Sequence, residues 1–374
     1  MDGRARTARR EGSGDLILTG EKSDKGRYVT LDAMRGLAAL AVAIFHLSNS
    51  LVPAGYLAVD FFFVLSGCVL DHTYRHRFAA GLGVGEFMAR RFARLWPLHL
   101  CGLVLCFAWL AWLVGHDATD IGWGTLLSGF GANLLFLPSV VGRDISPINP
   151  PAWSLLMEFG ANALMAFFAI RRSTRGLVIM LAVMAVVLVA DMTLTQAVTP
   201  FEGGTSVANM GYRWHDVHLG MVRTMFSFLF GMVLARRLEG AAPRVSGRAL
   251  GAMVMVPLLL LVPLTRWARF GFDLAFILIA SPLLVLAGAR LQLPARWQRT
   301  GMFLGDLSYP LYAVHYFWTY PVITYGYQHG WPVGLSLAVF LAAALGCALI
   351  CAKFVDLPLR KRLGAGFDAV LTRK

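Results

Sequence analysis

Residues 31–46 read LDAMRGLAALAVAIFH, an apolar run with an arginine near its beginning and a histidine at its end. Similar runs of roughly 17–25 residues, each long enough to cross a hydrocarbon core of about 30 Å as a helix, recur as far as residue 352. The chain is 57% hydrophobic and 15% charged, with a mean hydropathy of +0.62, which is unusual for a soluble domain. Because a backbone in lipid must satisfy its own polar groups, these runs predict an all-α polytopic membrane protein.

The basic residues determine the expected topology. Hydropathy alone offers these candidate spans: 34–51, 56–71, 95–115, 121–141, 151–170, 177–198, 218–235, 249–264, 271–289, 301–325 and 331–352. Both ends of the chain are basic, so the positive-inside rule places both termini in the cytoplasm and requires an even number of crossings. The run 121–141 is the weakest, because glycines, an asparagine and a proline interrupt it. We therefore assign it to a re-entrant or outer-surface segment and predict about ten transmembrane helices.

The remaining composition sets the expected domains and excludes several classes of protein. We expect residues 1–29 to form a disordered basic cytoplasmic tail without a cleavable signal, residues 30–362 to form the membrane domain, and residues 363–374 to form a short cytoplasmic tail. The net charge of +13 follows from the positive-inside rule, so no nucleic-acid partner is expected. The five cysteines lack zinc-type spacing, which excludes a metal site. The predicted location is the inner (plasma) membrane, as a multi-pass protein.

Arg35 and His46 are the first candidates for chemistry. They are separated by 11 helical steps, which is close to a whole number of turns and a rise of about 16 Å, so they share one helix face at different depths. A thioester donor such as acyl-CoA carries phosphates at one end of an extended arm. Arginine suits phosphate and histidine suits general-base catalysis, so donor phosphates at Arg35 would place the thioester near His46. The competing interpretations are an interfacial basic residue and a structural histidine.

Asp60 and Glu158 are candidate catalytic carboxylates. A short loop joins the first two spans, so Asp60 could lie beside His46 and orient its imidazole, although it could also cap its helix or pair elsewhere. Glu158 follows Ser154 by four residues, which places both on one helix face at a depth comparable with that of His46. Glu158 could orient the histidine, contact a sugar or act as the base itself. Ser154 is a candidate substrate-binding residue or a helix cap.

Two further groups complete the candidate site. Arg91 and Arg94 stand at the predicted cytoplasmic end of the third span and could bind donor phosphates beside Arg35, or serve only as positive-inside residues. On the tenth span Ser308 and His315 share a face. His315 is therefore a candidate substrate-binding residue, with a structural role as the alternative.

These motifs together resemble the membrane acyltransferase-3 family, which includes O-acetyltransferases of polysaccharides. The resemblance covers roughly residues 28–362 and is carried by the segments LDAMRGL at 31–37 with His46, VDFFFVLSG at 59–67, RFAR at 91–94, WSLLME at 153–158 and GDLSYPLYAVH at 305–315. It implies a ten-helix domain, an acyl-CoA donor reached from the cytoplasm, and an essential arginine and histidine at Arg35 and His46. It also implies roles for Arg91, Arg94, Ser154 and Glu158. The chain departs from the family where Met157 replaces the first of two usual acids.

The sequence therefore predicts a membrane O-acyltransferase that moves an acyl group, acetyl in the simplest case, from cytoplasmic acyl-CoA to a hydroxyl of a cell-surface or lipid-linked saccharide. Acyl-CoA is expected as a co-substrate, with no permanently bound cofactor, and membrane lipid and the saccharide are the other expected partners. The alternative is a transporter or flippase of a lipid-linked saccharide that transfers no acyl group. The sequence shows no convincing internal repeat, which weakens the transporter interpretation.

Overall fold

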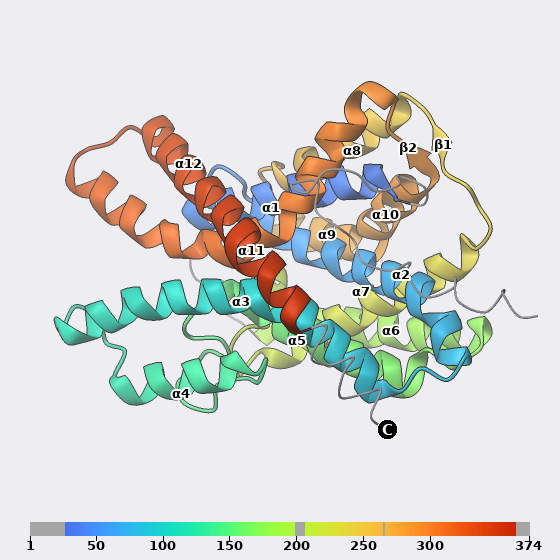
Figure 1. Ribbon diagram of the computed structural model, residues 1–374, viewed down its shortest axis with the longest axis horizontal. Coiled ribbons are helices and arrows are strands. Elements are labelled where there is room, and N and C mark those ends of the chain that lie inside the picture. The colour runs from blue at the N-terminus through green and yellow to red at the C-terminus, as the bar shows by residue number, and fades with distance from the viewer. Residues whose placement is uncertain (1–26, 199–205, 265, 364–374) are drawn as a thin grey trace, which may run out of the picture.

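The computed structural model describes residues 27–198, 206–264 and 266–363, and these are almost entirely helical (Figure 1). The main elements, in chain order, are α1 (Val29–Leu47), α2 (Ala58–Ala79), α3 (Val84–Gly115), α4 (Trp123–Leu134), α5 (Trp153–Leu164), α6 (Thr174–Val198), α7 (Val217–Arg237), β1 (Arg244–Val245), α8 (Arg248–Leu260), α9 (Arg266–Ala275), α10 (Ser281–Arg290), β2 (Leu291–Gln292), α11 (Ala295–Gln328) and α12 (Val333–Cys351). The strands form a single parallel pair. The all-α fold is confirmed. Most of the expected terminal tails lies outside the described residues.

The helices lie where the hydropathy runs predicted them. Eight helical stretches in the described part of the chain are long and apolar enough to cross a membrane: Val29–Leu47, Gly55–Ala79, Val84–Gly115, Pro150–Ala169, Thr174–Val198, Val217–Arg237, Ala268–Arg290 and Val333–Leu363. The other two predicted spans correspond to α8, which is apolar but has 13 residues, and α11, which has 34 residues and is more polar. The polar composition of α11 has a simple cause, because this helix faces the interior of the bundle and supplies much of the candidate site.

The run 121–141 contains α4, which has 12 residues and is about 18 Å long. This length is too short to cross the hydrocarbon core, as expected. Two side chains of α3 hold the end of α4. Trp96 donates to the carbonyl oxygen of Leu134 (2.9 Å), and the Nε2 atom of His99 lies 2.7 Å from that of Asn133. The chain then returns to the bundle and enters α5.

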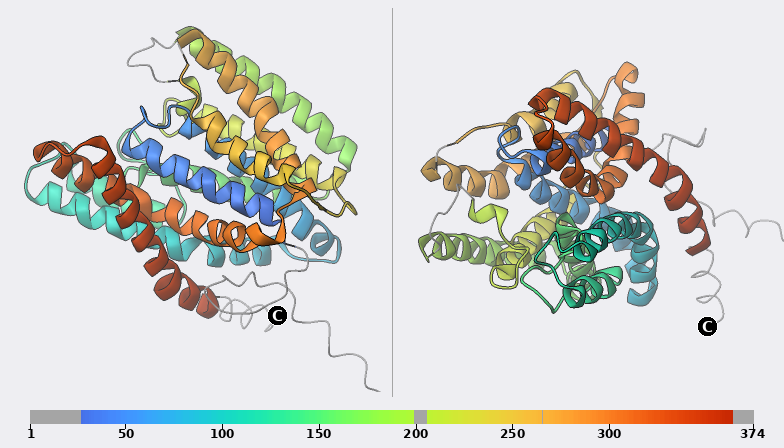
Figure 2. Two further views of the ribbon diagram at one scale, coloured as in Figure 1. Left: turned by 90° about the horizontal axis from the view of Figure 1, so that it is seen from above. Right: turned by 90° about the vertical axis from the view of Figure 1, so that its left-hand side faces the viewer.

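Two helix pairs form the centre of the bundle. α1 packs along α11, and α2 packs along α7 (Figure 2). A Cβ atom at Gly36 would lie 2.5 Å from the carbonyl oxygen of Leu304, and one at Gly67 would lie 2.0 Å from that of Phe228. No side chain fits at either place, so the backbones of each pair are in direct contact. The side chains that line these two contacts are therefore fixed in depth relative to one another.

Candidate active site

Two histidines meet where α1 packs on α11. His46 lies in the last turn of α1, and its Nδ1 atom is 3.1 Å from the Nε2 atom of His315 and 2.9 Å from the carbonyl oxygen of Val42. The Nδ1 atom of His315 lies 2.9 Å from the carbonyl oxygen of Tyr312 and 3.1 Å from that of Leu311. His315 is fully buried, whereas His46 is partly exposed.

These contacts determine which nitrogen atoms carry protons when both rings are neutral. A carbonyl oxygen only accepts hydrogen bonds, so His315 must carry its proton on Nδ1 and keep a lone pair on Nε2. The Nδ1 atom of His46 faces two acceptors, the carbonyl oxygen of Val42 and the Nε2 lone pair of His315. This Nδ1 atom must therefore be protonated as well. The basic nitrogen of His46 is therefore Nε2. His315 orients the ring and can stabilise its positive charge after protonation, which is the role expected of a carboxylate in a catalytic triad.

His46 lines a small cavity of about 30 Å³, together with Tyr56, Val59, Trp153 and Tyr312. This volume holds about one water molecule. Most of the wall is aromatic or aliphatic, so the partly exposed imidazole lies in a largely apolar environment. A base in such a place can act on a small group that enters the cavity.

The expected pairing of Asp60 with His46 is wrong. Asp60 and Arg223 are fully buried and form a two-point ion pair, with Nη2 to Oδ2 at 2.6 Å and Nε to Oδ1 at 3.2 Å. Arg223 also donates to the carbonyl oxygens of Ala208 and Met210. Since Ala208 lines the His46 cavity, this ion pair holds one wall of the cavity in place. The sequence analysis missed Arg223, although an arginine in the middle of an apolar run is itself a signal.

Glu158 was expected at a depth comparable with that of His46, and its hydrogen bonds go to residues other than His46. One oxygen of Glu158, Oε1, accepts hydrogen bonds from Ser66 (2.7 Å) and from Nη2 of Arg91 (2.9 Å). Glu158 therefore lies level with Arg91, one helical turn beyond Ser154. It therefore does not orient His46 directly, and its use as a base or as a sugar contact stays a prediction.

Ser154 and His315 are buried and bonded to other residues instead of being open to a substrate. The Oγ atom of Ser154 lies 2.6 Å from the hydroxyl of Tyr312 and 3.1 Å from the carbonyl oxygen of Pro151. Tyr312 stands one turn before His315 on α11. Ser154 therefore supports the helix that carries His315, and the predicted substrate contacts of both residues are replaced by contacts within the bundle.

Arginines gather at the opposite end of α1 from His46. Arg35 donates to the Oγ atom of Ser308 and to the carbonyl oxygen of Gly305, both at 2.7 Å, and its side chain is 30% exposed. Asp32 is 3.2 Å from it and is itself paired with Arg27. These contacts fix the Arg35 guanidinium while leaving part of it open to a ligand.

Arg91 and Arg94 have different environments although they are three residues apart. Arg91 was predicted to be open to the donor phosphates, but it is buried against Glu158. Arg94 is exposed and makes no ion pair or hydrogen bond within the described residues, and its positive charge acts on Arg35. Arg360, which ion-pairs with Asp356 at 2.8 Å, is within electrostatic range of Arg94. Arg360 belongs to the basic C-terminal end of the chain, and nothing in its local sequence indicates that it lies near Arg94.

Comparison with known proteins now identifies the family. The family model described as an acyltransferase domain (acyltransferase-3) matches residues 28–353. The chain belongs to the acyltransferase-3 family. It is therefore a multi-pass membrane protein with acyltransferase activity. No solved structure matches the chain.

Curated relatives match different fractions of the chain. "Protein 2 in picA locus" of Rhizobium radiobacter is 35% identical over 45% of this chain and 95% of its own length. The acyltransferase MdmB of Streptomyces mycarofaciens is 26% identical over 81% of this chain and 80% of its own length. The peptidoglycan O-acetyltransferase OatA of Listeria monocytogenes is 38% identical, but over only 19% of this chain and 12% of its own length.

Proposed function

We propose that this acyltransferase moves an acetyl or similarly small acyl group from acyl-CoA to a hydroxyl of a cell-surface or lipid-linked saccharide. One observation carries the proposal. A single helix, α1, has a partly open arginine near one end and a histidine with a free Nε2 lone pair at the other, about 16 Å apart. Acyl-CoA has its phosphates and its thioester at opposite ends of an extended arm, so both ends of the donor find a suitable partner.

The proposed reaction uses His46 as a general base. Nε2 of His46 removes the proton from the acceptor hydroxyl while that oxygen attacks the thioester carbonyl carbon. The carbon–sulfur bond breaks, and the CoA thiolate leaves and receives the proton from His46. The new ester remains on the saccharide and the neutral histidine is restored. His315 accepts the Nδ1 hydrogen bond of His46 throughout and stabilises the transient imidazolium.

The two ends of the site suggest where each substrate approaches. Arg35, Arg94 and Arg360 form a basic group that suits the CoA phosphates, with Arg–phosphate contacts of the two-point type. By the positive-inside rule this end would face the cytoplasm. The cavity beside His46 holds about one water molecule, so it must widen to admit even an acetyl group and favours short acyl groups over long ones. The name of the OatA relative, a peptidoglycan O-acetyltransferase, supports a saccharide acceptor.

The decisive experiment uses the purified full-length protein with radiolabelled acetyl-CoA. An acyltransferase with this donor should release CoA and label a saccharide acceptor, whereas a transporter should do neither. Mass spectrometry of surface glycans from a deletion strain and its parent would then identify the acceptor and the acyl group. If well-folded protein leaves acetyl-CoA and other short acyl-CoA thioesters unchanged with every glycan of its host, the proposed donor is wrong.

The predicted membrane topology, which determines the side from which the donor approaches, has a separate test. Topology reporters fused near residues 173, 242 and 295 should report the cytoplasm, and one near residue 205 should report the outside. A reporter at 173 that gave an outside signal would mean that one crossing before α6 has been miscounted. It would also reverse the side from which the donor approaches.

A further inference from the structure

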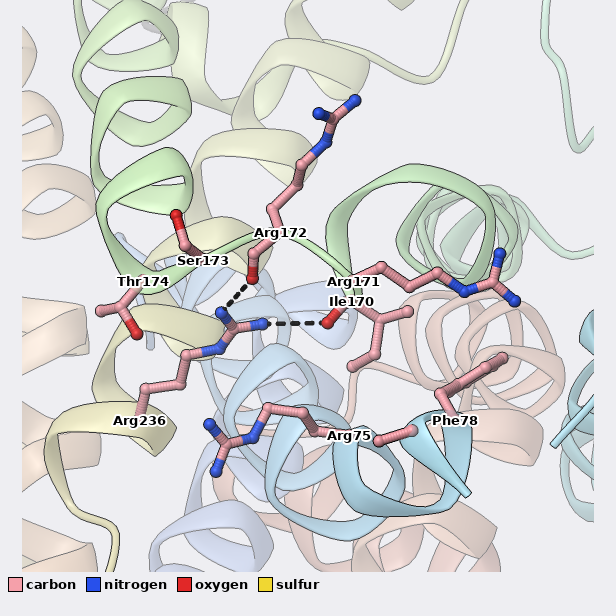
Figure 3. A pocket seen from close by; sticks show the side chains of 9 residues that line it. Arg75, Phe78, Ile170, Arg171, Arg172, Ser173, Thr174 and Arg236 are labelled. Carbon is pink, nitrogen blue, oxygen red and sulfur yellow. Dashed lines mark hydrogen bonds between the residues drawn. The ribbon is translucent and has the colours of Figure 1, made fainter. Parts of the chain in front are cut away.

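A second cavity, of about 460 Å³, lies apart from the candidate active site (Figure 3). It is an open cavity bordered by the last turns of α2, by the turn at residues 170–173 that leads into α6, and by the end of α7. Phe78, Ala79 and Ile170 supply an apolar wall, and the remaining lining residues are Arg75, Arg171, Arg172, Ser173, Thr174 and Arg236. The proposed acyl-transfer mechanism uses none of these residues.

Arg236 makes the base of this cavity rigid. Its side chain is 4% exposed and ion-pairs with the buried Asp71 at 3.1 Å. Two of its nitrogen atoms donate to the carbonyl oxygens of Ile170 (3.2 Å) and Arg172 (2.5 Å), as Figure 3 shows. The turn between α5 and α6 is thus tied to α7, so the cavity is already formed without a ligand.

The rim of the cavity carries more positive charge than the protein itself neutralises. Asp71 balances Arg236, and Glu239 accepts a hydrogen bond from Arg75. Arg171 and Arg172 are exposed and have no ion pair within the part of the chain that the structure describes. In Figure 3 their side chains extend away from the turn in different directions and bond to none of the residues drawn, so a ligand in the cavity would require them to turn toward it.

The first turn of α6 adds hydrogen-bond donors to this charge. Ser173 caps the helix, its Oγ atom accepting from the backbone nitrogen of Gly176 at 3.1 Å. The N-terminus of a helix of this length presents backbone N–H groups and a partial positive charge, which suit a phosphate group. The two free arginines and these N–H groups lie on the same rim.

The surface beside the cavity is strongly apolar. Phe167 and Phe168 are 59% and 58% exposed just before the turn, and Val178 and Ile179 are exposed on the first turns of α6. We infer that this cavity binds a phosphate group, and that the adjoining apolar surface favours a phosphate carried by an anionic membrane lipid. Basic pockets between helices at the positively charged side of a membrane protein suit such headgroups.

The test measures the thermal unfolding of the purified, delipidated full-length protein as lipid is added. Phosphatidylglycerol should raise the unfolding temperature saturably, and phosphatidylcholine at the same concentrations should have a much smaller effect. The double substitution Arg171→Gln with Arg172→Gln should raise the half-saturating concentration of phosphatidylglycerol about tenfold or more, since charge-assisted contacts to the phosphate are lost. Both residues are exposed and unpaired, so the variant should unfold at the wild-type temperature without lipid.

Arg175→Gln is the control, because Arg175 is an exposed arginine on the first turn of α6, close in sequence to Arg171 and Arg172, and does not line the cavity. It should keep the wild-type response. An equal loss in this control, or equal responses to the two lipids, would overturn the inference. Inorganic phosphate and pyrophosphate test whether the bound phosphate group comes from a lipid or from a soluble molecule. Competition by them at concentrations comparable to the lipid supports a site for soluble phosphate and rejects the lipid, whereas saturation by phosphatidylglycerol alone supports the lipid.

Discussion

The two central helix pairs carry polar residues with the same spacing, but these residues have different bonding partners. On α1, Arg35 and His46 are 11 residues apart, and on α2 the same interval separates Asp60 and Asp71. The α7 arginines neutralise both α2 carboxylates in buried ion pairs. On the α1–α11 pair, Arg35 bonds to a hydroxyl and a carbonyl and shares the Asp32 carboxylate with Arg27, while His46 faces a neutral imidazole. Arg35 therefore keeps part of its charge, and His46 keeps a lone pair, for a ligand.

This difference gives a way to separate catalytic from structural polar groups inside the membrane. The 11-residue spacing alone would make the polar residues of α1 and of α2 equally good catalytic candidates. What distinguishes them is whether the protein already satisfies the group, because a buried group with a complete set of partners has no capacity left for a substrate. By this criterion the α1–α11 pair carries the residues available for catalysis, and the polar residues of the α2–α7 pair stabilise the fold.

The largest expected effect is on His46. His46→Ala should fold and insert normally but lose about 10²–10⁴-fold in acyl transfer, the usual cost of removing a positioned general base. His99→Ala is the matched control, since His99 is a buried histidine bonded to the carbonyl oxygen of Asn133 away from the cavity. It should affect stability more than turnover per folded molecule. Near-normal acyl transfer by a folded His46→Ala protein would show that His46 is not the general base.

Asp60 and Arg223 should behave in the opposite way. Removing one partner of a buried ion pair leaves an uncompensated charge and typically costs about 3–5 kcal/mol of stability. Arg223→Met should therefore lower the unfolding temperature and the yield of folded protein, and Asp60→Leu combined with Arg223→Met should recover much of the loss. A stable Asp60→Asn protein that binds the donor but transfers nothing would restore Asp60 as a catalytic residue.

His315 tests whether the partner of His46 matters for catalysis. His315→Ala removes the acceptor for the Nδ1 hydrogen bond of His46, and a hydrogen bond to a charged group is worth about 1.5–3 kcal/mol, or roughly 10–100-fold in rate. The loss should appear in kcat and leave the KM for the donor unchanged. His315→Gln should recover part of the rate, because its amide oxygen can accept the same bond. Equal losses in both variants, together with lower stability, would indicate a packing role.

Much of this arrangement could be predicted from the sequence, and the rest depended on contacts between distant segments. Hydropathy located the helices, and the interrupting glycines, asparagine and proline identified 121–141 as too weak to span, because composition is a local property. Helical periodicity placed Ser308 and His315 on one face, and the structure confirms it, since they contact Arg35 and His46 respectively. The partners of the carboxylates could not be predicted, because the helix neighbouring α2 begins more than 130 residues after α2 ends.

The smallest expected effect concerns Arg91 and Arg94, which repeat the same contrast on one helix. Arg94 is open, so Arg94→Ala should raise the KM for acyl-CoA about tenfold, the cost of one charge-assisted contact, with kcat and the unfolding temperature unchanged. Arg91 is committed to Glu158, so Arg91→Ala should chiefly lower stability, and Glu158→Gln should reduce that cost by removing the unpaired carboxylate. Arg90→Ala is the control, because Arg90 pairs with Glu86 on the exposed side of α3. If Arg91→Ala instead kept full stability and raised the donor KM as much as Arg94→Ala, the pair with Glu158 would have to open when the donor binds, and Arg91 would belong to the donor site after all.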